Sequence, residues 1–411
     1  MTRKIVRVPA LAAVVFAVLA VSPSSASAMV DVREHLGPPA HRGVDAAYGD
    51  CAPAAKESLP GIPWAQQRLA PAQVWTLARG DGELVAVIGT GVSAKAPALK
   101  GAVLAGRDVR TGGRADSDCS GHSTFIAGLV AARERPKQGF AGVAPGVRVY
   151  PVRVTDDKDR VEAADLAEGI RAAVDAKAGV VAIGVSVGGP TTALRAAVQY
   201  AAKHDVVLVA STDAPSRVDS DSTTAYPAAL PGVLAVASVA QTGAVSNAAG
   251  TGAALVAAPG ENLISVAPRG QGQVSGSGSN IQVGLAAGAA ALVRDYRPRL
   301  KAPQVIARLE TTADHPSGPL PDAALGYGIL DPASAVSTDL PAEEDYWADP
   351  PASASLDVPL ATLPDTGART VALLVSGAAL GVSVLLAVVF ALVREARRRR
   401  RHAVTPPLGQ T

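Results

Sequence analysis

The stretch VSGSGSNIQVGLAAGAAALVR, residues 274–294, constrains the fold more than any other part of this 411-residue chain. A loop rich in glycine and serine runs into a segment built almost entirely of Ala, Gly, Leu and Val. Small residues recur at helical spacing, which predicts a helix buried on nearly every side: Gly284, Ala287, Gly288 and Ala291. Each glycine costs a helix about 1 kcal/mol relative to alanine, so we expect another backbone to pack very close to Gly284 and Gly288. Some hydrolases present a nucleophile where such a loop meets its helix, and here that place holds Asn280.

The first 28 residues predict a secretory signal peptide. Positive charges at positions 3, 4 and 7 precede an apolar run over residues 8–21, and Ala26-Ser27-Ala28 follows. This order of charge, apolar segment and small-residue exit is typical of an exported chain cleaved after Ala28. An uncleaved anchor is the alternative, for which the apolar run is short. Residues 29–62 then form an N-terminal extension rich in Pro, Ala and Gly.

Residues 370–393 predict one transmembrane helix. The segment Val371–Val393 contains 23 residues without a charge, enough to cross a bilayer as a helix. The tail, residues 394–411, begins with six arginines among eight residues, which favours the cytoplasmic side. The sequence therefore predicts a single-pass cell-membrane protein with an extracytoplasmic N-terminal domain. Residues 338–369 form a Pro-rich linker between the two.

The charge between these ends is mildly acidic. The formal net charge of +2 comprises +3 from residues 1–28 and +5 from residues 394–411, which leaves −6 for residues 29–369. An acidic exported domain argues against nucleic acid as a partner. About 340 residues can bury one large core.

The chain has two cysteines, Cys51 and Cys119. In an exported chain a disulfide between them is expected, with two free thiols as the alternative. The bond would tie the N-terminal extension to the body of the domain.

Residues 63–337 alternate buried strands with helices. Apolar runs that are too continuous for half-exposed strands predict the centre of a parallel sheet: Glu83–Ile88, the end of 139–154, Val180–Val187, Val206–Ala210 and Val233–Val239. Helical patterns lie between them: the segment opened by His122, Glu162–Ala176 and Thr191–Lys203. This alternation predicts an α/β fold, a parallel β-sheet flanked by helices on both faces. The first strand ends at Gly89, at the edge where open α/β sheets place ligand sites.

Seven segments in this order resemble the landmarks of a subtilisin-like serine protease. They are VAVIGTGV (85–92), GHSTFIAGLVAA (121–132), GVAPGVRVYPVRV (142–154), SVGG (186–189), YPAALPGVLAVASV (226–239), VAAPGENLIS (256–265) and GLAAGAAALVR (284–294). The resemblance covers residues 60–337. More narrowly the chain is similar to the mycosins, membrane-anchored subtilases of type VII secretion systems. The features that carry this are PWAQQRLAP (63–71), the cysteine just before GHS, the GYGILDP ending, and the Pro-rich stretch before one membrane helix.

The resemblance implies a catalytic triad that this chain does not retain. Subtilases use aspartate, histidine and serine: the serine attacks a peptide carbonyl, the histidine takes its proton, and the aspartate orients the imidazole. The aspartate position is Gly89, the histidine is His122, and the serine position is Asn280. His122 is followed by Ser123 in place of the family's glycine. Counting along VVLVASTDA puts Ala214 at the oxyanion asparagine.

The register of this comparison has an alternative. Anchoring on GAAALVR places Asn280 at the nucleophile without a gap, and Gly284 at the family's proline. Choosing Ser279 or Ser277 instead would rotate the helix and turn its packing face away.

These positions predict a pseudoprotease. An asparagine amide has no proton that a neutral imidazole removes, so Asn280 cannot be activated as a serine is. Gly89 offers no acceptor to orient His122, and Ala214 lacks a side-chain donor worth about 3 kcal/mol of transition-state stabilisation. His122 is then expected only to hydrogen-bond Asn280 or water.

The sequence gives little indication of a substitute acid, a metal site or a cofactor. Asp116, Asp118 and Asp213 lie near the site in sequence, and we expect them to be exposed loop carboxylates and not substitutes for the missing acid. No cluster of His, Cys and carboxylates has metal-ligand spacing, so neither a zinc site nor a cofactor is predicted, although a structural calcium in a loop stays open.

Peptide binding is the activity that could survive. Ser186, Val187, Gly188 and Gly189 resemble the subtilase strand that pairs with substrate backbone, so an extended peptide could add there without being cut. A cleft filled by local loops is the alternative, and the sequence leaves both open.

Three functions follow. The first is a membrane-tethered pseudoprotease that acts as a scaffold or peptide-binding subunit beside type VII secretion membrane proteins. The second is a working mycosin-like serine endopeptidase with a displaced serine and a substitute acid. The third rests on Leu363-Pro364-Asp365-Thr366-Gly367, which looks like a sortase signal and implies a cell-wall surface protein.

Overall fold

The computed structural model describes residues 51–213, 224–246, 253–278, 280–340, 385–386 and 388–394. The chain divides into two units, Met1–Trp347 and Ala348–Thr411. The described residues of the second unit are helical, and no described helix of the chain is both long and apolar enough to cross a membrane. The signal peptide, the LPDTG motif, most of the predicted membrane span and the arginine-rich tail after Arg394 lie outside the described residues.

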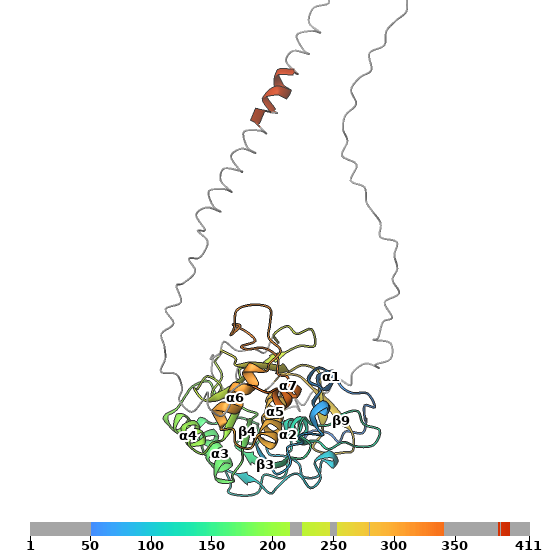
Figure 1. The fold of residues 1–411 in the computed structure, drawn as a ribbon, viewed down its shortest axis with the longest axis vertical. Helices are drawn as coiled ribbons and strands as arrows, with labels where there is room; N and C mark the ends of the chain where they lie inside the picture. The colour runs from blue at the N-terminus through green and yellow to red at the C-terminus, as the bar shows by residue number, and fades with distance from the viewer. Residues whose placement is uncertain are drawn as a thin grey trace, which may run out of the picture. The chain divides into compact units, whose positions relative to one another are not determined.

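A seven-stranded sheet forms the centre of the first unit, in the order β2-β3-β1-β4-β5-β6-β7. Figure 1 labels two of its strands, β3 and β4, with α3 and α4 to one side and α2 and α5 to the other. All of its neighbouring strands pair in parallel. The strands are β1 (Leu84–Gly89), β2 (Arg107–Asp108), β3 (Arg148–Arg153), β4 (Val180–Ile183), β5 (Val207–Ser211), β6 (Val233–Val239) and β7 (Val256–Pro259). Every residue of β4, β5, β6 and β7 is buried. The continuous apolar runs of β4, β5 and β6 predicted their place correctly, whereas β7 was not predicted.

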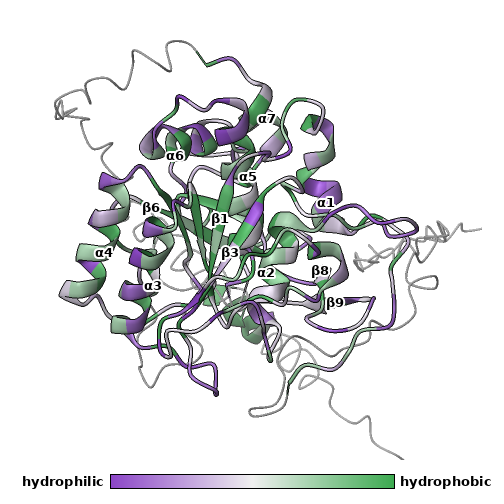
Figure 2. Ribbon diagram, turned by 90° about the horizontal axis from the view of Figure 1, so that it is seen from below, coloured by the Kyte–Doolittle hydropathy of each residue, from purple (hydrophilic) through white to green (hydrophobic). Residues whose placement is uncertain are grey.

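Helices cover both faces of this sheet. The helices and short 3₁₀ turns are α1 (Trp64–Leu69), η2 (Pro71–Val74), η3 (Pro97–Leu99), α2 (His122–Ala131), α3 (Ala163–Asp175), α4 (Thr192–Lys203), α5 (Val283–Tyr296), α6 (Ala302–Thr311) and α7 (Pro332–Ser337). Alternate β1 residues point to opposite sides: Val85 and Val87 pack in one core with α2 and α5, whereas Ala86 and Ile88 pack in another with α3 and α4. Figure 2 shows the hydrophobic sheet between these helices, whose outer turns are hydrophilic. The α/β prediction is confirmed.

The helix predicted from the opening stretch is α5, and it is buried over most of its length. All residues from Val283 to Val293 are buried. A Cβ at Gly284 would lie 2.8 Å from the carbonyl oxygen of Ile126, so the backbone of α2 does approach it closely. At Gly288 the neighbour is instead the side chain of Val143, at 2.6 Å. The expectation of a close backbone is therefore confirmed at Gly284 and wrong at Gly288.

The strand predicted over Val180–Val187 ends at Ile183. Beyond it the N–H of Gly184 still donates to Ile88 O at 2.9 Å, but the chain then leaves the ladder. Val187 pairs instead with Tyr226 in an isolated antiparallel bridge. In this connection Gly184 and Val187 are buried, whereas Val185 and Ser186 are partly exposed. The apolar residues that predicted a longer strand therefore lie outside the sheet.

A disulfide joins Cys51 to Cys119, as predicted. The bond fixes the start of the described chain beside the loop that leads into α2. The N–H of Ala52 donates to Cys119 O at 2.7 Å, and Ala55 bridges Gly270 next to the antiparallel hairpin β8 (Leu263–Val266) and β9 (Gln273–Gly276). The extension is therefore held along the domain surface by backbone pairing as well as by the disulfide.

Candidate functional site

The predicted site residues gather where the parallel strands end. Gly89 is the last residue of β1, Gly184 follows β4, and Asp213 follows β5, and these three strands are neighbours. His122 begins α2, and Asn280 precedes α5 by three residues. The carboxyl ends of parallel strands and the first turns of the helices that follow share one edge, which is where α/β folds place their sites.

Gly89 and Ser123 are fitted to each other. A Cβ at Gly89 would lie 2.2 Å from the hydroxyl oxygen of Ser123, closer than two such atoms can approach. The Ser123 hydroxyl is held there because it accepts the N–H of Thr90 at 2.8 Å, while the Thr90 hydroxyl accepts the N–H of Ser123 at 3.1 Å. The serine therefore fills the space that any side chain at position 89 would need.

His122 is buried, and its ring nitrogen Nε2 has a backbone partner. Its Nε2 lies 2.9 Å from the carbonyl oxygen of Gly184. A carbonyl oxygen only accepts, so Nε2 carries the proton and donates it. In a working triad this nitrogen accepts the proton of the serine hydroxyl. The partner at Nε2 is a backbone carbonyl. A hydrogen bond from His122 to Asn280 or water stays a prediction.

Asn280 adopts a left-handed backbone conformation, with φ +67°, and its side chain is buried. Asparagine is one of the few residues that tolerate this region, because its short polar side chain can bond locally. Its side-chain oxygen is nevertheless buried without a hydrogen-bond partner. Of the alternative serines, Ser277 accepts the N–H of Asn262 at 2.8 Å, and Ser279 lies outside the described residues.

The carboxylate of Asp118 accepts hydrogen bonds from the residues at the start of α2. One carboxylate oxygen accepts the N–H of Gly121 at 2.9 Å, and the other accepts both the N–H and the hydroxyl of Thr124 at 2.9 and 2.7 Å. Burial raises the pKa of this carboxyl above its ordinary value. The expectation of an exposed carboxylate is wrong here, because the helix start needs an internal acceptor for its unpaired N–H groups. Asp116, in contrast, is partly exposed and pairs with Arg114.

Asp213 is also buried, with 1% of its surface exposed, so the same expectation is wrong there. The Ser238 hydroxyl donates to Oδ2 at 3.0 Å, while Oδ1 has no hydrogen-bond partner. Desolvation raises the pKa of Asp213 to about 6, opposed by interactions with Ser238, Gln282, the backbone of Asn280 and Ser211. The signal in the sequence was its place as the first charged residue after a fully apolar strand. Ala214, the predicted oxyanion position, lies outside the described residues.

The predicted peptide-binding segment already forms backbone hydrogen bonds within the domain at Val187. The N–H and C=O of Val187 both bond Tyr226, each at 3.0 Å. Successive residues of an extended strand direct their backbone groups to opposite sides, so those of Ser186 and Gly188 point away from Tyr226. Ser186 and Gly188 are partly exposed, and Gly189 is exposed.

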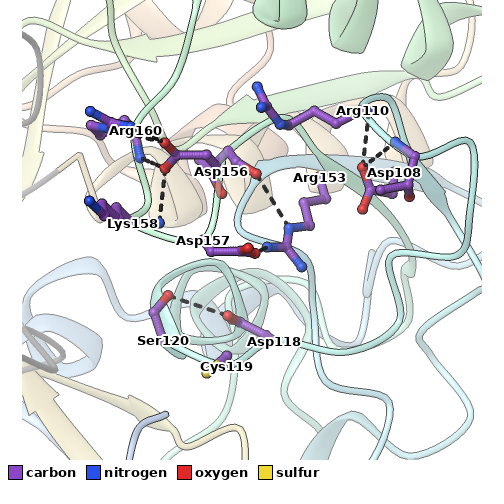
Figure 3. A network of polar contacts seen from close by, with 12 residues as sticks. Asp108, Arg110, Asp118, Cys119, Ser120, Arg153, Asp156, Asp157, Lys158 and Arg160 are labelled. Atoms are coloured by element: carbon purple, nitrogen blue, oxygen red, sulfur yellow. Dashed lines mark hydrogen bonds and ion pairs between the residues drawn. The ribbon is translucent and has the colours of Figure 1, made fainter. Parts of the chain in front are cut away.

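A charged rim, residues 153–160, borders the site and was not singled out from the sequence. Arg153 is the register partner of Gly89 across β1 and β3. Figure 3 shows the side chains that follow it: Arg153 pairs with Asp157 at 3.0 Å, and Arg160 pairs with Asp156 at 2.8 Å. Such exposed pairs contribute little stability, so the rim matters chiefly for the charge it presents. The run TDDKDR after an apolar strand was the available signal.

Within the described ranges, no three His, Cys, Asp or Glu side chains come together as a metal site.

Known proteins resemble this chain in both sequence and structure. The sequence profile of the subtilase family matches residues 80–328. Mycosin-3 of Mycobacterium tuberculosis (strain ATCC 25618 / H37Rv) is 34% identical over 403 residues, covering 83% of this chain and 85% of that protein. The structure of MycP3 protease from the type VII (ESX-3) secretion system matches with a TM-score of 0.63 and 29% identity, over 74% of this chain and 97% of that one. MycP1 from the ESX-1 type VII secretion system matches with the same TM-score and identity, over 71% and 91%.

Proposed function

The chain belongs to the subtilase family, and we propose that it is an exported, membrane-anchored pseudoprotease within that family. In this proposal Gly89, His122, Asn280 and Ala214 occupy the aspartate, histidine, serine and oxyanion positions of the triad site. The protein acts as a scaffold or peptide-binding subunit, and its place is a type VII secretion system.

The observation that carries the proposal is the fit of Ser123 against Gly89. Losing an aspartate from an otherwise unchanged site would leave a hole beside the imidazole. Here the hydroxyl of Ser123 stands 2.2 Å from where the Cβ would be and bonds the backbone of Thr90. A side chain at position 89 would have to displace the Ser123 hydroxyl from the Thr90 N–H. This favours a site in which residues 89 and 123 changed together over a site that lost only its aspartate.

The proton chemistry supports the same conclusion. A serine protease needs an unprotonated nitrogen facing the nucleophile. Nε2 of His122 donates to Gly184 O instead. The side chain at position 280 is an amide, which has no proton that imidazole removes at neutral pH. Loss of the nucleophile is sufficient alone, because the triad residues act as a unit.

The placement in type VII secretion rests on the relatives. Mycosin-3 and the two solved structures align over most of their own length. Both structures are of proteins from type VII secretion systems. The anchored topology rests on the signal peptide and the span over residues 370–393.

Peptide binding remains available in this site. The backbone groups of Ser186 and Gly188 lie on the side of the strand that Val187 does not use. An extended peptide can pair with that side by strand addition.

The rival function is an active endopeptidase. It requires a serine hydroxyl beside His122 and a carboxylate behind the ring. Asp118 already accepts three bonds from the start of α2, which argues against it as the carboxylate behind the ring. Of the alternative serines, Ser277 accepts the N–H of Asn262, and Ser279 lies outside the described residues. The wall-attached alternative concerns LPDTG only and is compatible with either chemistry.

A fluorophosphonate probe tests the proposal. The purified full-length chain, the His122→Ala variant and an active subtilisin are incubated with the probe, and covalent adducts are measured by intact-mass spectrometry. We expect modification of the subtilisin alone. Labelling of the unaltered chain that disappears in His122→Ala would mean an active serine protease. Mass spectrometry of the mature C-terminus separates membrane retention from sortase processing, which would leave Thr366 as the last residue.

A further inference from the structure

The last described residues of the domain run past two arginines. Helix α7 ends at Ser337, and the chain continues through Thr338 and Asp339. Arg297 Nη2 donates to the carbonyl oxygen of Thr338 at 3.0 Å, and the guanidinium of Arg308 donates to the same oxygen. Arg297 also pairs with Asp339 at 3.2 Å. Two positive charges therefore meet one carbonyl and one carboxylate at the end of the described domain.

The end of α5 and the turn after it present positive charge and an aromatic ring at the surface. Tyr296 is 41% exposed, and Arg299 is exposed as well. The guanidinium of Arg297 lies 5.5 Å from the centroid of the Tyr296 ring. Tyr296, Arg297 and Arg299 are named the exit surface. An exposed aromatic ring beside two arginines suits a segment that carries both carboxylates and aromatic groups.

Positive charge is in excess at the exit surface. Asp295, which precedes Tyr296, accepts backbone N–H groups of residues 79–81 at 2.8–3.2 Å, and this carboxylate therefore holds the loop before β1. In the described part of the chain, Asp339 is the carboxylate that pairs with the exit surface, through Arg297. The side chain of Asp339 is fully exposed, so this pair is screened by solvent and leaves the surface attractive to further carboxylates.

The chain that follows Leu340 carries the opposite charge. Residues 343–347 read EEDYW, three carboxylates followed by two aromatic side chains, and they lie outside the described residues. The first unit of the chain extends to Trp347. The stretch from Leu340 to Trp347 reaches at most about 24 Å. A link this short gives an effective concentration in the millimolar range, so contacts of millimolar affinity suffice to hold the segment.

We propose that residues 343–347 dock in cis on the exit surface, with the acidic side chains against Arg297 and Arg299 and the aromatic ones against Tyr296. Complementary charge, the exposed aromatic ring and the point at which the described chain ends carry this proposal. It concerns neither the triad positions nor peptide binding, so it goes beyond the proposed function.

Docking shortens the tether of the domain. In the proposed topology the linker, residues 338–369, connects the domain to the membrane anchor. With residues 343–347 held on the domain, the chain that is free to extend begins at residue 348, and the reach of the linker falls by about a third. The docking itself does not depend on the anchor, and only this consequence rests on the proposed function.

Chymotrypsin cleavage after Tyr346 and Trp347 measures the docking. The full-length chain in detergent and a synthetic peptide of residues 340–352 are digested, and the ratio of the two cleavage rates reports protection by the domain. We expect the segment to be cut roughly tenfold more slowly in the chain than in the peptide. Arg299→Glu should raise the rate in the chain about fivefold, and Tyr296→Ala about threefold.

Two variants separate docking from a change of net charge. Arg195→Glu, at an exposed position of α4, makes the same charge change away from the exit surface and should alter the rate by less than about twofold. Glu344→Arg added to Arg299→Glu should restore at least about half of the lost protection, relative to the matching peptide. An effect of Arg195→Glu as large as that of Arg299→Glu, no effect of either, or no recovery in the reversed pair overturns the proposal.

Dilution distinguishes docking in cis from docking between two copies. In cis, protection stays constant as the protein is diluted from about 10 to about 0.1 µM, because the link fixes the effective concentration. Protection that is lost on dilution would assign the surface to a second copy and overturn the proposal. Fluorophosphonate labelling of the unaltered chain would refute the pseudoprotease and leave these cleavage rates unchanged.

Discussion

Adding one methyl group at Gly89 should destabilise the protein because of Ser123. The Cβ of Gly89→Ala would overlap the Ser123 hydroxyl oxygen at 2.2 Å. The hydroxyl is the end of a short side chain and can rotate away, but it then abandons the Thr90 N–H that it accepts at 2.8 Å. Ser123 is fully buried and Thr90 is 5% exposed, so water does not replace that bond. Leaving a buried N–H unpaired costs about 1–3 kcal/mol, which is the expected loss of unfolding free energy.

The size of the effect should depend on residue 123. Ser123→Gly by itself leaves the same N–H unpaired, and it also places glycine in the first turn of α2, at a cost of up to about 1 kcal/mol more. In that background the methyl group added at position 89 enters vacated space and removes no further bond. Gly89→Ala should therefore cost about 1–3 kcal/mol when Ser123 is present and close to zero in the Ser123→Gly background.

Guanidinium denaturation of the four proteins measures this coupling. The fluorescence of Trp64 and Trp75, which pack against the main core, reports unfolding of the full-length chain in detergent. Gly189→Ala is the matched control, because a Cβ there meets nothing within 4 Å and should change stability by no more than about 0.5 kcal/mol. If Gly89→Ala lowers the unfolding free energy by the same amount in the two backgrounds, within about 0.5 kcal/mol, the proposed coupling between Gly89 and Ser123 is refuted.

Three further changes have outcomes set by the structure. The pKa of Asp213 rises from 3.8 to about 6 on folding, so the stability that this carboxyl contributes is complete below pH 4 and lost as the pH rises through 6. The unfolding free energy of Asp213→Asn, relative to that of the unaltered chain, should therefore rise by roughly 3 kcal/mol across that window. Parallel pH profiles of the two proteins would contradict this. Replacing Cys51 and Cys119 by serine releases a crosslink with a sequence separation of 68, and should lower the unfolding free energy by up to about 4 kcal/mol in non-reducing denaturation, with no difference once both proteins are reduced. Gly284→Ala sets a Cβ 2.8 Å from the Ile126 carbonyl, so it should destabilise by about 1–3 kcal/mol although alanine favours helices; a gain in Tm would show that α2 and α5 separate easily.

The architecture was predictable from the sequence because burial leaves a local trace. Strands covered on both faces read as unbroken apolar runs, and Val233–Val239 matches β6 to the residue. Alternation with amphipathic helices then implies a parallel sheet whose sites lie at the strand ends. The residue types at positions 89, 122 and 280 were likewise visible, and they limit the chemistry wherever the side chains point.

The tertiary structure alone decided what those residues contact. Ser123 and Gly89 are 34 positions apart, and only the packing of α2 against the end of β1 shows that one fills the space of the other. The same packing gives His122 a carbonyl acceptor and buries Asp118 and Asp213, both expected in solvent. Whether a polar group is buried depends on which strand ends and helix starts converge, and this is set by long-range contacts that no local pattern records. The sequence therefore determined which residue types stand at these positions, and the fold determined what each of them contacts.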